Sequence, residues 1–141
     1  MTEPVDPGLR AADEAVDPEV VELAGRVFDA ARAGDAPALA AYVNAGAPVD
    51  LCNERGDSLV MLAAYHGHAD AVRTLLERGA DANRANDRGQ TPLAGAVFKG
   101  EDAVIEALLA GGADPHAGQP SAAATAEMFG RTALVERFAA Y

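Results

Sequence analysis

Apolar residues recur along this chain with the spacing of short amphipathic helices, and glycines interrupt the pattern at regular places. Val72, Leu75 and Leu76 stand at i, i+3 and i+4, which predicts a helix with one apolar face. Gly79 follows and supplies the left-handed residue that ends many helices. Residues 58–65 carry a similar pattern just before. Together the two segments predict a pair of short helices followed by a turn-rich loop.

The whole pattern repeats at a step of 33 residues. The apolar pair Leu75-Leu76 recurs as Leu108-Leu109 and, less closely, as Tyr42-Val43. The glycines keep the same step, in the series Gly34, Gly67 and Gly100, the series Gly46, Gly79 and Gly112, and the pair Gly56 and Gly89. So many coincidences at one offset predict a repeat architecture, in which each unit packs only on its neighbours.

Four units follow from this step, after a leading segment over residues 1–16. They span residues 17–52, 53–85, 86–118 and 119–141. Asp17-Pro18 predicts the start of the first helix, and Thr91-Pro92 opens the third unit, where proline in the first turn gives up no hydrogen bond. Gly130 follows Gly100 by only 30 residues, so the last unit has a loop three residues shorter. End units that depart most from the pattern are expected to cap the array.

These residues resemble the ankyrin-repeat family. The matching segments are Gly89-Gln90-Thr91-Pro92-Leu93, Gly67-His68 and residues 75–83, of which residues 108–114 are a copy. The resemblance covers about residues 19–138. It implies an all-α fold, a solenoid of four helix-loop-helix units with β-hairpin-like connecting loops, and a single domain over residues 17–141 with a concave face. It also implies a scaffold that binds another protein.

The chain departs from the family at one position in each central unit. The family's Thr-Pro-Leu-His tetrad reads Ser58-Leu59-Val60-Met61 in the second unit and Thr91-Pro92-Leu93-Ala94 in the third. Both copies therefore lack the histidine that, in the family, ties neighbouring loops by hydrogen bonds.

Charge argues against nucleic acid as a partner. The formal net charge is −11, and the arginines are scattered, so the surface repels phosphate backbones. Residues 1–20 hold six carboxylates against one arginine. The acidic composition of residues 1–16 predicts a disordered tail. The alternative is that Val5, Leu9 and Val16 dock on the first unit.

Cys52 is the only cysteine, which leaves no disulfide and no cysteine-rich zinc site. The first residues lack the basic and apolar regions of a signal peptide, and no stretch approaches the ~18 apolar residues of a membrane span. We therefore expect a cytoplasmic protein without membrane contact. The abundance of alanine, glycine and arginine, with Lys99 as the only lysine, points to a bacterial source.

Three features invite a chemical interpretation, and each has a structural one. His66, His68 and Asp70 could ligate a metal, but a catalytic zinc needs three ligands in a shaped cavity, and Gly67-His68 is an ordinary dipeptide of the family. Cys52 stands among carboxylates, which disfavour a thiolate. The glycines close helices and do not join a strand to a helix as phosphate loops do. The sequence predicts no metal, no cofactor and no enzymatic activity.

The repeat step also predicts a binding face. In ankyrin-like stacks the concave face consists of the end of each first helix and the tips of the loops. The residues before each helix-breaking glycine include Arg32, Tyr65, His66, Phe98, Lys99, Met128 and Phe129, and the loop tips hold Glu54, Arg55, Asp57, Asp87, Arg88 and Gln90. A row of aromatic residues is typical of binding hot spots. The alternative is that the rings pack on one another to cover gaps between units.

Three functions remain open on this evidence. The first is a monomeric scaffold for protein–protein interaction. The second is a dedicated accessory or inhibitory subunit of one bacterial enzyme or toxin, and the third, which the residues support least, is an enzyme.

Overall fold

The computed structural model describes residues 17–141, which form eight helices in four successive pairs. The predicted disordered tail, residues 1–16, lies outside the described residues. The pairs are α1 (Pro18–Ala33) with α2 (Ala36–Asn44), α3 (Leu59–Tyr65) with α4 (Ala69–Glu77), α5 (Pro92–Lys99) with α6 (Asp102–Ala110), and α7 (Ala122–Met128) with α8 (Thr132–Ala139).

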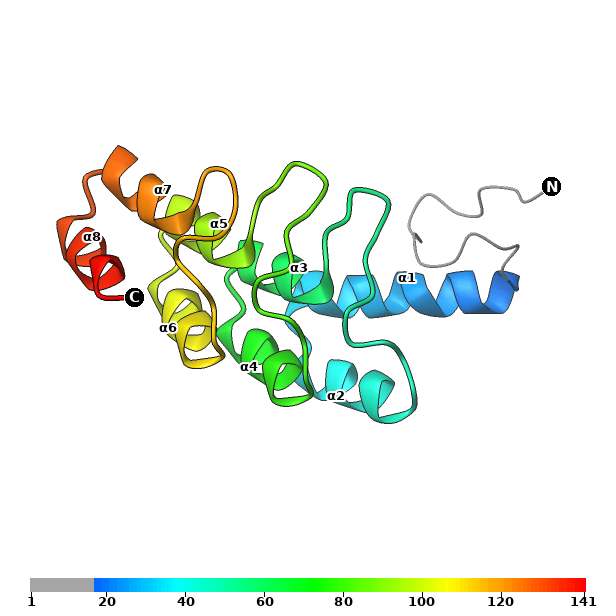
Figure 1. The fold of residues 1–141 in the computed structure, drawn as a ribbon. Coiled ribbons are helices and arrows are strands. Elements are labelled where there is room, and N and C mark those ends of the chain that lie inside the picture. Colours follow the sequence, from blue (N-terminus) through cyan, green and yellow to red (C-terminus); the bar gives the residue numbers. More distant parts are fainter. Residues whose placement is uncertain (1–16) are drawn as a thin grey trace.

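The helix pairs stack in two rows (Figure 1). In the first row α3 contacts α1 and α5, and α5 contacts α7; in the second row α4 contacts α2 and α6. The loops that leave the second row rise past the first row before the next pair begins (Figure 1). Isolated antiparallel bridges, Cys52 with Ser58 and Gly118 with Ser121, close two of these loops at the base. The predicted all-α solenoid with hairpin-like loops is confirmed.

The shorter loop expected in the last unit is present. The bridge from Gly118 to Ser121 spans three residues fewer than the bridge from Cys52 to Ser58.

Among the helices that the structure describes, none has both the length and the apolar composition needed to cross a bilayer.

Side-chain caps fix where the first helices begin. The Asp17 carboxylate accepts a hydrogen bond from the Glu19 amide at 2.8 Å, and the Thr91 hydroxyl accepts one from the Ala94 amide at 3.2 Å. Ser58 and Ser121 cap α3 and α7 in the same way. Each cap satisfies an amide that has no partner inside the helix. The predicted starts at Asp17-Pro18 and Thr91-Pro92 are therefore correct.

Gly79 shows why glycine recurs at the ends of the second helices. With φ at 96°, it lies in the left-handed region, where a Cβ is unfavourable. Its amide donates to the Leu76 carbonyl and the Ala80 amide donates to the Leu75 carbonyl, both at 3.1 Å. This pair of bonds is a Schellman motif.

The core lies between consecutive units. Leu75 and Leu108 are fully buried, and in the last unit Leu134 and Phe138 are buried at the positions that Val104 and Leu108 occupy one unit earlier. The apolar stripe of each second helix is thus covered by its own first helix and by the neighbouring unit.

The identical place of Leu75-Leu76 and Leu108-Leu109 in consecutive units predicts that both leucines of each pair are fully buried, and this prediction is wrong for Leu76. This side chain is only partly buried because it lies at the border with the next unit, against Gly111. A Cβ added to Gly111 would come within 2.4 Å of the Leu76 Cδ1. Leu76 therefore packs where the neighbouring unit has no side chain.

Asparagines organise the loops in the absence of the family's histidine. The Asn53 side-chain oxygen accepts from the Arg55 and Asp57 amides, and the Asn86 side-chain oxygen accepts from the Arg88 and Gln90 amides. The Asn86 amide group also donates to the Asp57 carboxylate at 2.9 Å, which joins the loops of the second and third units. Asn53 and Asn86 are 33 residues apart, a correspondence that the sequence analysis did not use.

A second set of side chains links each unit to the next near the second helices. Asp50 accepts from the Asp81 amide at 3.0 Å, Asn83 accepts from the Asp114 amide at 2.7 Å, and a ring nitrogen of His116 lies 3.1 Å from the Phe138 carbonyl oxygen. The three residues follow one another at the repeat step. His116 thus bridges the third unit to the last one.

We expect Leu108→Ala to lower the free energy of unfolding by ~2–5 kcal/mol, because it removes a fully buried side chain between units. Urea denaturation followed by circular dichroism measures the change. Leu76→Ala is the control, with a smaller loss since this leucine is only partly buried. A loss at Leu108 below about 1 kcal/mol would contradict the packing described here.

Candidate protein-binding face

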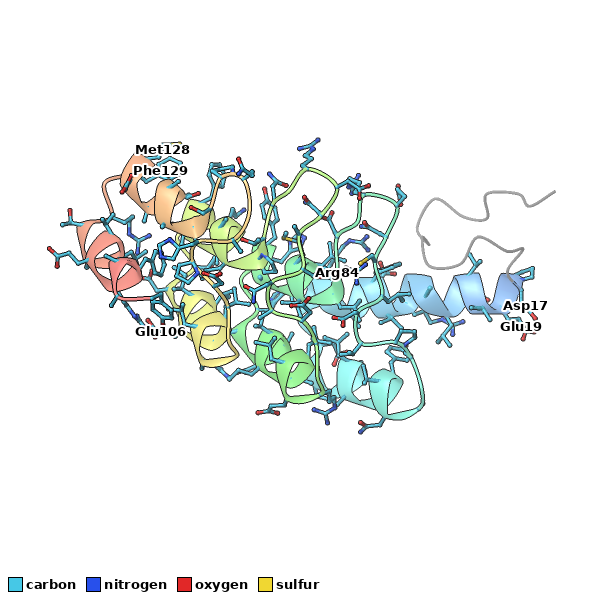
Figure 2. The ribbon with its side chains drawn as sticks, viewed as in Figure 1. Asp17, Glu19, Arg84, Glu106, Met128 and Phe129 are labelled. Carbon is cyan, nitrogen blue, oxygen red and sulfur yellow. The ribbon has the colours of Figure 1, made fainter. Side chains whose placement is uncertain are left out.

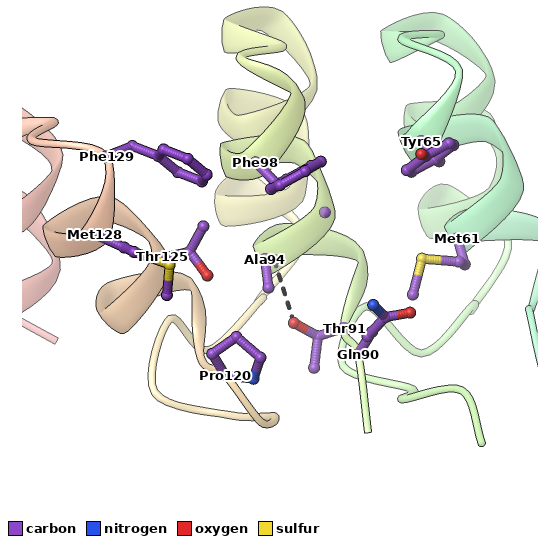
Figure 3. Close-up of a pocket in the computed structure, with 11 residues that line it drawn as sticks. Met61, Tyr65, Gln90, Thr91, Ala94, Phe98, Pro120, Thr125, Met128 and Phe129 are labelled. Carbon is purple, nitrogen blue, oxygen red and sulfur yellow. Dashed lines mark hydrogen bonds between the residues drawn. The ribbon is translucent and has the colours of Figure 1, made fainter. Parts of the chain in front are cut away.

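Two adjoining hollows lie between the ends of the first helices and the loop tips, and together they form the concave face. The first, the apolar hollow, has a volume of about 310 Å³. Its walls include Met61, Tyr65, Gly95, Phe98, Met128 and Phe129 (Figure 3). The second, the polar hollow, has a volume of about 570 Å³ and shares Met61, Tyr65 and Gln90 with the first.

The aromatic row stands on the last turns of three first helices. Tyr65 ends α3, Phe98 is next to last in α5, and Met128 and Phe129 stand at the end of α7. Figure 3 shows the rings of Tyr65, Phe98 and Phe129 following one another across these helices. The repeat places them there, because residues at the same position of stacked units become neighbours.

The row is exposed to solvent. The exposed fractions are 44% for Tyr65, 57% for Phe98, 66% for Met128 and 49% for Phe129. Phe98 and Phe129 do contact each other edge to face, with ring centroids 5.4 Å apart. This contact covers only part of their surface, so mutual packing does not account for the row. Met128 and Phe129 project together at the end of α7, apart from Glu106 on the second row (Figure 2).

Gly95 deepens the apolar hollow from within α5. A Cβ added there would meet only the Tyr65 Cδ1, at 4.0 Å. Glycine in a helix interior is about 0.5–1 kcal/mol less favourable than alanine, and neither a positive φ nor a close backbone contact requires it at this position. The sequence analysis did not single out Gly95, although a glycine in the middle of a predicted helix was the available signal.

The loop tips border the polar hollow. Arg55 and Asp57 form an ion pair there at 3.6 Å, and the Arg55 carbonyl accepts a hydrogen bond from the Asp87 amide at 3.0 Å. The predicted binding residues in this hollow are Arg32, Glu54, Arg55, Asp57, Tyr65, His66, Asp87, Arg88 and Gln90. Phe98, Met128 and Phe129 line the apolar hollow. Lys99 is the one predicted residue in neither lining, and its Nζ lies 4.5 Å from the Tyr65 ring centroid.

Positive groups gather on one side of the concave face. Arg32 and Lys99 stand at the ends of α1 and α5, and the imidazole of His66 stands at the end of α3 between them. We call these three residues the cationic edge. Partial desolvation, and then the charges of His68, Arg32 and Lys99, hold the pKa of His66 below its ordinary value. Arg32, His68 and Lys99 therefore all disfavour protonation of the His66 imidazole, although the chain as a whole is strongly acidic.

The His66, His68 and Asp70 side chains do not converge on a common point. A ring nitrogen of His68 lies 2.8 Å from the Arg32 carbonyl oxygen, and Asp70 pairs with Arg73. The His66 and His68 rings stack with their centroids 6.5 Å apart. Within residues 17–141, no group of three His, Cys, Asp or Glu side chains is placed to hold a metal ion. The lack of a bound metal stays a prediction.

Comparison with known proteins identifies the repeat. A family model described as ankyrin repeats, in three copies, matches residues 27–119. The ankyrin repeat protein PA3287 of Pseudomonas aeruginosa is 46% identical over 51 residues, which are 36% of this chain and 30% of that protein. The chain thus matches less than a third of its curated relative. The crystal structure of the human ASB11 ankyrin repeat domain superposes with a TM-score of 0.60 at 32% identity, over 63% of this chain and 40% of that one.

We expect Gly95→Ala to raise the free energy of unfolding by about 0.5–1 kcal/mol, because the added methyl group favours the helix and meets open space. Gly34→Ala is the matched control. Its φ is 73° and its Cβ would come within 2.3 Å of the His68 ring, so it should destabilise the protein by about 1 kcal/mol or more. Urea titration of both variants measures the two effects. A loss of stability in Gly95→Ala would mean that the hollow is not open at this point.

We expect an NMR titration of the imidazole signals to place the pKa of His66 below its ordinary value and Lys99→Gln to raise it, since one of the repelling charges is gone. Arg84→Gln, on an exposed residue outside both hollows, is the control and should leave this pKa unchanged. Because the unfolded chain binds this proton more tightly, the contribution of His66 to stability should fall as the pH drops below about 6.5. An unshifted or raised pKa would show that the positive groups do not gather around His66.

Proposed function

Because the chain belongs to the ankyrin-repeat family, we propose that it is a non-catalytic scaffold that binds another protein through its concave face. Ankyrin repeats are in general protein–protein interaction modules, and the proposal applies this general role to one surface. The observation that carries it is the row of exposed apolar side chains, Tyr65, Phe98, Met128 and Phe129. The proposal treats residues 17–141 as one domain and the protein as a cytoplasmic monomer.

Without a partner, the apolar side chains of this row are exposed to water, which is energetically unfavourable. Contiguous apolar patches on soluble monomers are rare and mark interaction sites, and hot spots are rich in large, rigid side chains. Phe98 and Tyr65 have few rotatable bonds and stand on helices that are buried on their other faces. A partner would therefore meet side chains that lose little freedom on binding.

The loop tips beside the apolar row support the same function. Polar and charged loop tips line the polar hollow beside Tyr65, and Asn53 and Asn86 hold these loops by hydrogen bonds. A polar rim around an apolar centre is the usual arrangement of protein interfaces. The Pseudomonas relative supports a bacterial source for the chain. A dedicated bacterial enzyme or toxin as the partner remains a hypothesis, which the identity of the bound protein decides.

The test begins with the full chain as bait in its native host, with quantitative mass spectrometry of the captured proteins. The leading candidate is then purified and its Kd measured by calorimetry. We expect Phe98→Ala and Tyr65→Ala to weaken binding by ~2 kcal/mol or more, because they remove anchors at the centre of the face. The melting temperature should change little, since both side chains are exposed.

Val20→Ala is the matched control. Val20 is 50% exposed on α1 and borders neither hollow, so this variant should bind as the wild type does. If Phe98→Ala unfolds the protein, the row belongs to the core. If the variant binds its partner with unchanged affinity, the binding face lies elsewhere.

A further inference from the structure

We propose that the concave face takes an extended acidic segment of the partner, with one large apolar side chain in the apolar hollow and a carboxylate of Asp or Glu at the cationic edge. The inference rests on the proposed function and specifies the chemistry of the segment that the face recognises.

The apolar hollow fits a single large side chain. Its volume of about 310 Å³ is at the lower end of ligand-binding pockets. Tyr65 and Phe98 line it from neighbouring helices (Figure 3). Gly95 also lines it, and a Cβ added there would meet only the Tyr65 Cδ1, at 4.0 Å, so this part of the hollow is open. An alanine at this position would favour the helix, so the glycine gives up stability and leaves space.

Lys99 marks the junction between the apolar and the charged parts of the face. Its ammonium group lies over the Tyr65 ring, 4.5 Å from the centroid, and the Tyr65 and His66 rings meet at 5.7 Å. Tyr65 lines both hollows, and His66 and Arg32 line the polar one. A peptide that fills the apolar hollow therefore brings its neighbouring residues next to the cationic edge.

The signs of the charges select an acidic segment. The chain has a net charge of −11, yet the helix ends that adjoin the rings present the positive charges of Arg32 and Lys99 on either side of His66. The carboxylates of the polar hollow stand on the loop tips, where Asp57 pairs with Arg55 at 3.6 Å. Arg32 pairs with Asp29 on its own helix at 3.0 Å, but such an exposed pair contributes little and leaves its guanidinium accessible to a second carboxylate.

A library of random short peptides, displayed on phage and selected on the tagged full chain, tests the inference. We expect the selected peptides to combine a large apolar residue with a nearby Asp or Glu. A fluorescent copy of the best peptide then gives Kd values. Lys99→Glu should weaken it by about tenfold or more, since a carboxylate replaces the ammonium group. Arg84→Glu makes the same change in net charge outside both hollows and should have little effect.

A double-mutant cycle and a variant that fills the apolar hollow complete the test. Changing the acidic residue of the peptide to its amide should weaken binding to the wild type but have little further effect on Lys99→Glu. Gly95→Leu should weaken every selected peptide at an unchanged or higher melting temperature, because it occupies the apolar hollow. Failure to select peptides, selection of basic ones, or equal effects of Lys99→Glu and Arg84→Glu would overturn the inference. The proposed function would still stand if the native partner is lost in Phe98→Ala.

Discussion

Within residues 17–141 no helix pair covers its own apolar surface, so every unit depends on its neighbour for burial. The stripe of α4 that contains Val72 and Leu75 is covered by α3 of its own unit and by α2 and α6 of the units on either side. The same contacts set the distance between successive helices. Because the spacing is fixed by packing, side chains at matching positions come to lie in rows. The concave face, with Tyr65 and Phe98 on adjacent helices, is a direct result of this stacking.

Polar side chains then join successive units by hydrogen bonds and ion pairs in addition to the apolar packing. At one place in the repeat the chain has Asp50, Asn83 and His116, three different side chains that each reach the backbone of the following unit. The requirement at this position is a polar atom at the right distance, whichever residue supplies it. At the last unit two ion pairs between α6 and α8 do similar work: Arg131 contacts Asp102 at 2.8 Å, and Arg137 binds both carboxylate oxygens of Glu106. Hydrogen bonding from Arg137 lowers the pKa of Glu106.

The sequence predicted the features that depend on local capping or on the equivalent position of residues in successive repeats. Helix starts at Asp17 and Thr91 follow from capping within one turn, and the shorter last loop follows from counting to Gly130. The neighbourhood of Tyr65 and Phe98 follows from the period alone. Their exposure did not, because a ring at the end of a helix can turn toward the core or toward solvent with the same sequence.

Features that depend on the direction of a side chain could not be predicted from the sequence pattern. Leu75 and Leu76 are adjacent and recur together as Leu108-Leu109, yet only the structure shows that Leu76 lies against Gly111 at the border between units. The hydrogen bonds of Asn53 and Asn86 depend on the loop conformation that they themselves stabilise. The positive charges around His66 come from three helices, so a scattered set of basic residues in the sequence becomes a local cluster only after stacking.

The position of Lys99 has a practical consequence for handling the protein. It is the only lysine in this sequence, and its ammonium group lies over the Tyr65 ring at the cationic edge of the concave face. Apart from an α-amino group, amine-reactive dyes, crosslinkers and sensor surfaces therefore find only this one side chain to couple to. The single thiol offers no alternative, because Cys52 is buried. Lysine coupling would turn the concave face toward the support and hide it, whereas a lysine-reactive crosslinker would join this face directly to whatever protein occupies it.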